Sequence, residues 1–239
     1  MKLVIAVTVR GKAAHASAPG RGRNAVYAMG RILGAIERLN GHLPVDDVLG
    51  SGSVAVTNVR CTAPSLCSIP DECTIVLDRR ITRQDTRSSV VDEVRQAIER
   101  VGEHAEVDVP RYDVPSYRGI RFPSERFFPA WALDADSGAA VAGRETYETL
   151  FGEPPRLGYW VFSTNGVATM GLHHIPTIGF GPGDERWAHA VDEHLPVDHL
   201  VRAAAWYAAF PSVYARTVGT PAPSKPRSQG QARAASRRG

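Results

Sequence analysis

Hydrophobic and polar residues in the first hundred positions follow two spacings in turn. Three segments rich in Val and Ile have largely alternating apolar and polar side chains, which predicts half-buried strands: residues 3–10, 53–61 and 73–81. Apolar residues recur every three or four positions over 24–39 and 85–101, which predicts two amphipathic helices, and a short strand follows at 105–109. This order is the ferredoxin-like βαββαβ pattern, so we expect an antiparallel sheet with two helices on one face.

The second half of the chain has a weaker pattern. A proline-containing loop over 110–129 suggests a domain boundary. Beyond it, helical spacing covers 137–151 and 198–214, a further helix is expected within 164–172, and 175–180 is typical of a short buried strand. Helices alternating with strands indicate an α/β layer, but the predicted strands are too few for a complete sheet.

The N-terminus has a second interpretation. Lys2 precedes a short apolar run, and Ala16-Ser17-Ala18 is similar to a signal-peptidase cleavage site. Polar residues interrupt the run, however, and its Val and Ile spacing favours a strand. No apolar stretch is long enough to cross a bilayer, so we expect no membrane association.

Charge and cysteine content exclude two further classes. The chain carries a formal charge of +3, but segment 220–239 holds five of the 28 basic residues and no acid, so the remainder is slightly acidic. We expect 217–239 to be a disordered basic tail, and no nucleic-acid partner. Cys61, Cys67 and Cys73 form no C-x-x-C motif. Free thiols in a reducing cytoplasm are the preferred interpretation, although Cys61 and Cys73 could face each other across a hairpin.

Two loops carry candidate chemistry. The sequence Gly11-Lys12-Ala13-Ala14-His15-Ala16-Ser17-Ala18-Pro19 places a histidine among small residues just after a strand, where it could donate a hydrogen bond to a developing oxyanion. In the second half, the glycine-rich loop 179–184 is followed by His189, and a loop imidazole is a suitable metal ligand. Alone, the glycine-rich loop is better explained as an ordinary tight turn, most lone histidines are not metal ligands, and the His15 loop is at least as compatible with an ordinary surface loop.

Taken together with Asn24, with Ile69-Pro70-Asp71 and with Asp78-Arg79-Arg80, these segments resemble one family. It is the zinc-dependent amidohydrolase and exopeptidase family of carboxypeptidase G, acetylornithine deacetylase and succinyl-diaminopimelate desuccinylase. The variant Pro64-Ser65-Leu66-Cys67 is most similar to the selenium-metabolism-associated hydrolase branch. The resemblance runs in order over about residues 1–215.

The resemblance implies a fold and a set of roles. Residues 1–113 match the lid, or dimerisation domain, and 114–216 match the C-terminal part of the α/β zinc-exopeptidase catalytic domain. His15 matches the lid histidine that polarises the scissile carbonyl in the partner's site, which implies a homodimer. His189 matches the last metal ligand. The remaining matches are substrate-binding: Arg79 or Arg80 for a carboxylate, Gly181 and Gly183 in the wall of the site, and Asn165 at a turn with backbone donors.

The sequence departs from the family in two places. Cys67 stands where many members have Asn, and no His-x-Asp motif, bridging Asp or Glu-Glu pair precedes the lid strand. The family's two zinc ions need those residues, so we expect a truncated chain that is inactive alone. The complete enzyme would hydrolyse a small-molecule amide of the peptide, N-acyl-amino-acid (deacetylase) or carbamoyl type. The alternative is a non-catalytic dimeric binding or regulatory module.

Overall fold

The computed structural model describes residues 1–160 and 162–219. It is a mixed α/β structure that divides into two compact units. Unit 1 comprises residues 1–134 and 156–178, and unit 2 comprises 135–155 and the chain from 179 onward.

Unit 1 is built on an antiparallel sheet with strand order β4-β5-β1-β6. Its strands are β1 (Lys2–Arg10), β4 (Ser53–Thr62), β5 (Glu72–Arg80) and β6 (Glu106–Asp108). The short strand β9 (Phe127–Phe128) pairs with the start of β1. This strand order confirms the ferredoxin-like prediction. It also confirms the strand expected near the start of the chain.

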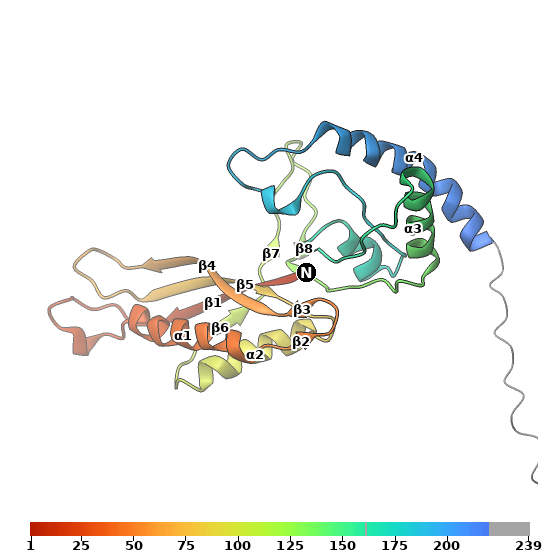
Figure 1. Cartoon of the computed structure of the whole chain (residues 1–239). Coiled ribbons are helices and arrows are strands. Elements are labelled where there is room, and N and C mark those ends of the chain that lie inside the picture. The colour runs from red at the N-terminus through yellow and green to blue at the C-terminus, as the bar shows by residue number, and fades with distance from the viewer. Residues whose placement is uncertain (161, 220–239) are drawn as a thin grey trace, which may run out of the picture. The chain divides into compact units, whose positions relative to one another are not determined.

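Helices α1 (Ala25–Leu39) and α2 (Arg87–Glu99) cover one face of this sheet (Figure 1). The side chain of Asn24 accepts a hydrogen bond from the Val26 amide and starts α1, and a reciprocal capping box between Thr86 and Ser89 starts α2. The apolar stripes of both helices pack on the inward residues of β1 and β5, and form one hydrophobic core.

The two faces of the sheet differ in chemistry. Every second residue of β5 is buried against the helices: Cys73, Ile75, Leu77 and Arg79. On the other face, β1 and β5 make polar cross-strand pairs, among them Thr8 with Thr74 at 2.9 Å and Arg10 with Glu72 at 2.6 Å. The strand period of two therefore separates a helix-covered face from a polar one.

Several short elements complete unit 1. They are η1 (Pro19–Arg21), η2 (Asn40–His42), β2 (Val45–Asp46), β3 (Gly50–Ser51), β7 (Arg111–Tyr112), β8 (Ser124–Glu125) and the π-helical turn η3 (Val167–Leu172). Strand β2 pairs with β3, and β7 pairs with β8.

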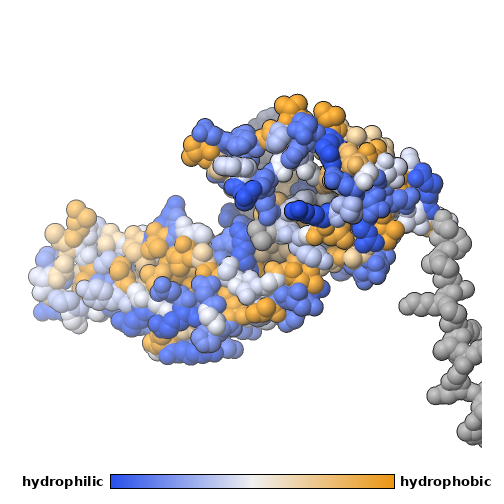
Figure 2. All heavy atoms as spheres, viewed as in Figure 1, coloured by the Kyte–Doolittle hydropathy of each residue, from blue (hydrophilic) through white to orange (hydrophobic). Residues whose placement is uncertain are grey.

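Unit 2 is formed by α3 (Gly138–Phe151), η4 (Glu185–Trp187) and α4 (Val197–Gly219). Helices α3 and α4 pack around Trp206, whose indole N–H donates to the Gly143 carbonyl at 3.2 Å and whose ring stacks on Phe210. Hydrophobic residues also lie on the exposed surface of α4 (Figure 2), where Leu200 is 49% and Val201 is 66% exposed.

Three predictions for the second half need comment. The strand expected at 175–180 is wrong: those residues are irregular and join no sheet, and the Ile175 amide instead donates to the Thr169 carbonyl at 2.9 Å. Helix α4 extends to Gly219, three residues into the expected tail, and segment 220–239 lies outside the described residues. None of the helices described is long and apolar enough to cross a membrane.

Candidate functional site

The loop that carries His15 lies close to the backbone of the residues just before helix α1. The Gly11 amide donates to the Asp71 carbonyl at 2.7 Å, and Lys12 pairs with Arg23 as an isolated β-bridge. A Cβ at Gly11 would collide with the carbonyl oxygen of Arg23. Glycine is therefore required where the chain leaves β1, because two backbones approach each other there.

Further along, the same loop pairs with the turn between β4 and β5. His15 and Ser68 form an isolated bridge, the Ala16 amide donates to the Cys67 carbonyl at 2.8 Å, and the Ile69 amide donates to the Ala14 carbonyl at 2.8 Å. Figure 1 shows both segments at the same end of the sheet. The backbone of His15 is thus fixed although its side chain is exposed.

The His15 ring has a local partner. Its Nδ1 atom lies 2.7 Å from the Ser17 hydroxyl oxygen, and the Ser17 backbone N–H donates to the same Nδ1 at 3.2 Å. The ring therefore uses its Nδ1 edge within the loop, which leaves Nε2 as the nitrogen that can meet a substrate.

The cysteines have three different environments. Cys67, at the position of the family's Asn, is exposed and contributes its backbone carbonyl to the His15 loop. Cys61 and Cys73 are direct partners in the β4–β5 ladder, with their Sγ atoms 2.8 Å apart and no disulfide. Burial, together with the neighbouring Cys61 thiol, raises the pKa of Cys73 to about 12.

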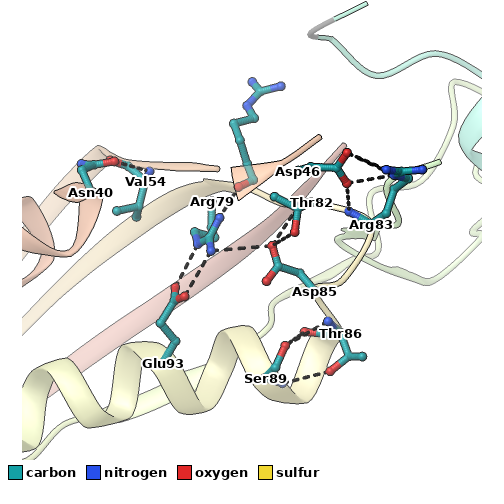
Figure 3. Close-up of polar contacts among 11 residues, drawn as sticks. Asn40, Asp46, Val54, Arg79, Thr82, Arg83, Asp85, Thr86, Ser89 and Glu93 are labelled. Atoms are coloured by element: carbon teal, nitrogen blue, oxygen red, sulfur yellow. Dashed lines mark hydrogen bonds and ion pairs between the residues drawn. The ribbon is translucent and has the colours of Figure 1, made fainter. Parts of the chain in front are cut away.

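The two candidate arginines point in opposite directions. Arg79 is fully buried, and its guanidinium makes a two-pronged ion pair with Glu93 of α2, at 3.0 and 3.2 Å, with Asp85 at 3.7 Å (Figure 3). Sequence reasoning missed this acidic partner. The alternation of Cys73, Ile75 and Leu77 was the available signal, because it assigns Arg79 to the helix-covered face.

Arg80 lies on the other face of β5 and lines a cavity of about 460 Å³ within unit 1. Hydroxyl and aromatic side chains share the wall: Ser51, Ser53, Thr82, Tyr159 and Trp160. The Arg80 side chain is 40% exposed and pairs with Asp78 at 2.7 Å, which also receives Lys2 at 3.1 Å. An incoming carboxylate would therefore compete with Asp78 for the guanidinium.

A second charge pair, whose carboxylate is buried and whose arginine is exposed, lies beside this cavity. Asp46 accepts hydrogen bonds from the Val48, Leu49 and Arg83 amides and from the Arg83 guanidinium, at 2.8 to 3.2 Å. Figure 3 shows the bonds from Arg83. The hydrogen bonds from Arg83 hold the pKa of Asp46 well below its usual range. This pair anchors the β2–β3 turn that forms part of the cavity wall.

His15 and Arg80 are far apart within one chain. Arg80 pairs with Lys2 at one end of the β1–β5 ladder, whereas Glu72 pairs with Arg10 at the other end, five residues before His15. At about 3.3 Å per residue, the ladder alone separates the two ends by roughly 27 Å. The structure therefore does not bring these two predicted residues to one substrate in a single chain.

Asn165 is exposed at the start of η3. The Gly166 amide donates to the Thr164 hydroxyl at 3.1 Å, and the Val167 and Ala168 amides donate to the carbonyls of Thr164 and Asn165. The backbone donors that the sequence suggested for an anionic group are thus used within the turn itself.

The remaining candidates lie together in one loop of unit 2. Gly183 has φ of +95°, which favours glycine, and its amide donates to His199 Nδ1 at 3.3 Å. His189 has φ of 62°, a conformation rare for residues with a side chain, and its amide donates to Glu193 at 3.1 Å. Gly181 is exposed. A histidine with a left-handed backbone conformation is strained, and such strained residues are frequent at functional sites.

The residues present do not form a metal site on their own. Across 1–160 and 162–219, no three His, Cys, Asp or Glu side chains are arranged to hold an ion. His189 is thus at most one ligand of a centre that needs several.

Comparisons with known proteins agree with this fold. A family model described as the peptidase dimerisation domain of the M20 family matches residues 3–106. The uncharacterized protein YgeY of Escherichia coli (strain K12) is 42% identical over 210 residues, which cover 88% of this chain and 52% of that protein. The chain thus spans about half the length of the curated relatives that it matches.

Solved structures give the same fold. A tripeptidase from Staphylococcus aureus superposes with a TM-score of 0.62 at 18% identity, over 90% of this chain and 52% of that one. An M20 family metallo-carboxypeptidase from Sulfolobus solfataricus gives 0.59 at 15% identity, over 90% and 59%. Residues 3–106 therefore match a peptidase dimerisation domain, and the chain has the fold of these peptidase structures. The resemblance seen in the sequence is confirmed by this domain match and by the shared fold.

Proposed function

We propose that this chain provides the lid and the C-terminal part of a dimeric amide hydrolase. Residues 1–113 act as the lid and 114–216 belong to the catalytic domain. His15 donates a hydrogen bond to the scissile carbonyl of a substrate held at the partner's site, and Arg80 binds a substrate carboxylate. The substrates are N-acyl amino acids, peptides or carbamoyl amino acids. The observation that carries the proposal is the His15 loop, fixed at both backbone edges at the end of a peptidase dimerisation domain.

Dimerisation through the lid is supported by the free edge of the sheet. Strand β4 is ten residues long, lies at the end of the strand order and has Val56 and Val59 exposed. An exposed, partly apolar edge strand pairs readily with another strand. The separation of His15 from Arg80 supports the same assembly, since two chains can bring both residues to one substrate.

Light scattering tests the dimer. We expect twice the chain mass of 25.8 kDa, reduced to the monomer mass by Val59→Lys on the β4 edge. Val114→Lys is the matched control, because Val114 is similarly exposed in a loop. A monomeric wild-type protein, or equal loss in both variants, would contradict lid pairing.

His189 is proposed as one ligand of the zinc centre, which in the family supplies the activated water. Because the described residues do not complete that centre, we assign to this chain only carbonyl polarisation, anion binding and dimerisation. The 239-residue protein with added zinc should not hydrolyse N-acetyl amino acids. Turnover that persists through purification and is abolished by His189→Ala would refute this assignment.

A binding module without catalysis is the second candidate, favoured by the cavity at Arg80. It predicts that small carboxylates bind the isolated chain measurably by calorimetry, and that Arg80→Met abolishes binding. Arg95→Met is the control, because Arg95 forms only an exposed ion pair on α2. Binding without any hydrolysis in a longer relative would favour this alternative.

The free thiols remain consistent with the proposed cytoplasmic location.

A further inference from the structure

We propose that Ser17 is a positioning residue that holds the neutral His15 ring in the tautomer with its proton on Nε2. The proposal rests on the proposed function, in which His15 must present a donor to a carbonyl. It deepens that function by naming the group that prepares the donor.

The backbone amide of Ser17 determines the direction of the hydrogen bonds. It donates to His15 Nδ1 at 3.2 Å, and an amide N–H can only donate. Nδ1 must therefore offer its lone pair. A neutral imidazole carries a single ring proton, so that proton lies on Nε2.

The Ser17 hydroxyl strengthens this arrangement. Its Oγ lies 2.7 Å from the same Nδ1, and with Nδ1 unprotonated the hydroxyl donates to it. The opposite tautomer would bring a ring N–H against the amide N–H of Ser17, which is repulsive. Two donors from one residue thus converge on one ring nitrogen, and both favour Nε2–H.

The loop backbone keeps the two residues in this relation. The Ala18 amide donates to the His15 carbonyl at 2.9 Å, which closes a turn around Ser17, and the Ala16 amide is bonded to Cys67 across the loop. Because the backbone is fixed on both sides of the ring, the alignment does not depend on burial of the exposed side chain.

The arrangement has a chemical consequence. A neutral imidazole with Nε2–H can donate to a carbonyl oxygen as negative charge develops on it. With the proton on Nδ1, Nε2 would present a lone pair to that oxygen and repel it. Ser17 therefore acts through His15, without touching the substrate itself.

Long-range proton–nitrogen NMR on the ¹⁵N-labelled full chain tests the tautomer directly. The sequence has eight histidines, and His15→Gln identifies the His15 signals by their loss. At a pH where titration shows the ring to be neutral, we expect an unprotonated Nδ1 and a protonated Nε2. The urea-unfolded chain gives the tautomer ratio without the loop.

Ser17→Ala keeps the backbone donor and removes the hydroxyl. We expect the ratio of Nε2–H to Nδ1–H to fall roughly two- to tenfold, as for the loss of one hydrogen bond, and Ser17→Thr to restore it. Ser68→Ala is the matched control, because Ser68 lies opposite His15 but its hydroxyl bonds Ser65 at 2.8 Å. That variant should leave the ratio unchanged.

A folded-state ratio equal to the unfolded one, or a ratio indifferent to Ser17→Ala, would overturn the proposal. The outcome is separable from the proposed function. A monomeric protein with the expected NMR signature would refute the dimeric assignment of the proposed function and leave the role of Ser17 intact. A dimer in which His15 acts at the partner's site, but with a tautomer ratio equal to that of the unfolded chain, would support the proposed function and refute the role of Ser17.

Discussion

Helices α1 and α2 of unit 1 cover a sheet, whereas α3 and α4 of unit 2 pack mainly on each other. The hydrophobic core cluster consists of residues between Leu3 and Val109, all in unit 1. In unit 2 the buried apolar residues are few, with Trp206 the largest, and α4 leaves Leu200 and Val201 exposed. Periodic apolar stripes occur in both units, but only unit 1 provides the sheet on which such stripes are buried.

The difference extends to charged groups. Unit 1 buries Arg79 and Asp46, each satisfied by several partners, while the ion pairs of unit 2 lie at the surface. Removing one partner of a buried ion pair strongly destabilises the fold, whereas an exposed ion pair contributes little to stability. Matched substitutions in the two units can therefore test whether stability resides in unit 1.

The largest effect is expected at the buried arginine. Arg79→Met leaves the Glu93 carboxylate without its partner and should lower the free energy of unfolding by about 3–5 kcal/mol. Arg202→Met removes a partly exposed arginine that pairs with Glu153 at 3.1 Å, donates to the Tyr147 hydroxyl at 3.0 Å and stacks on Phe151. This substitution should lower the free energy of unfolding much less. Urea unfolding followed by circular dichroism measures both. Comparable losses in the free energy of unfolding would show that the ion pair of unit 2 contributes as much to stability as the buried pair of unit 1.

Apolar truncation gives the next effect. Ile5→Ala in the centre of β1 removes a fully buried side chain and should cost about 2–5 kcal/mol. Leu200→Ala on α4 should stay within about 0.5 kcal/mol, because Leu200 is half exposed. A large loss at Leu200 would mean that its side chain is covered in solution, for instance by a second copy of the chain.

The same contrast explains what the sequence could predict. Strand and helix periods in the first hundred residues gave the correct order of elements, since each apolar stripe there has a surface to bury against. Segment 175–180 has the composition of a buried strand but pairs with no strand in the structure, so composition alone was insufficient. A strand is defined by its neighbour as much as by its residues.

The candidate site was predictable to a lesser degree. The sequence placed His15 just beyond a strand, but its partner Ser17 depends on the turn that the loop makes. Arg79 and Arg80 looked equivalent as a pair, although the alternation along β5 distinguishes them. The acidic partners Glu93 and Asp85 follow Arg79 at distances in sequence that no local pattern indicates, because packing of α2 on the sheet determines them.

The smallest effect concerns acid stability, and it compares two aspartates with lowered pKa. Hydrogen bonds from Arg83 lower the pKa of Asp46 in unit 1, and hydrogen bonds from Arg186 lower that of Asp184 in unit 2 to about 2. A carboxyl whose folded pKa lies below its unfolded value near 3.8 stabilises the fold above that value. The contribution is lost as pH falls toward the folded pKa, because the unfolded chain takes up the proton first.

Asp46→Asn should therefore lower stability at pH 7 by about 1.5–3 kcal/mol, as for charge-assisted hydrogen bonds. The difference from the wild-type protein should shrink as pH falls below 4. Asp184→Asn should have no such pH-dependent difference in the unfolding of the β-sheet, because Asp184 and Arg186 are exposed and two residues apart. Urea midpoints from pH 7 to pH 3 decide between these outcomes. If only Asp184→Asn changed the urea midpoints below pH 4, acid unfolding would begin in unit 2. The unit with the smaller core would then control the stability of the whole chain.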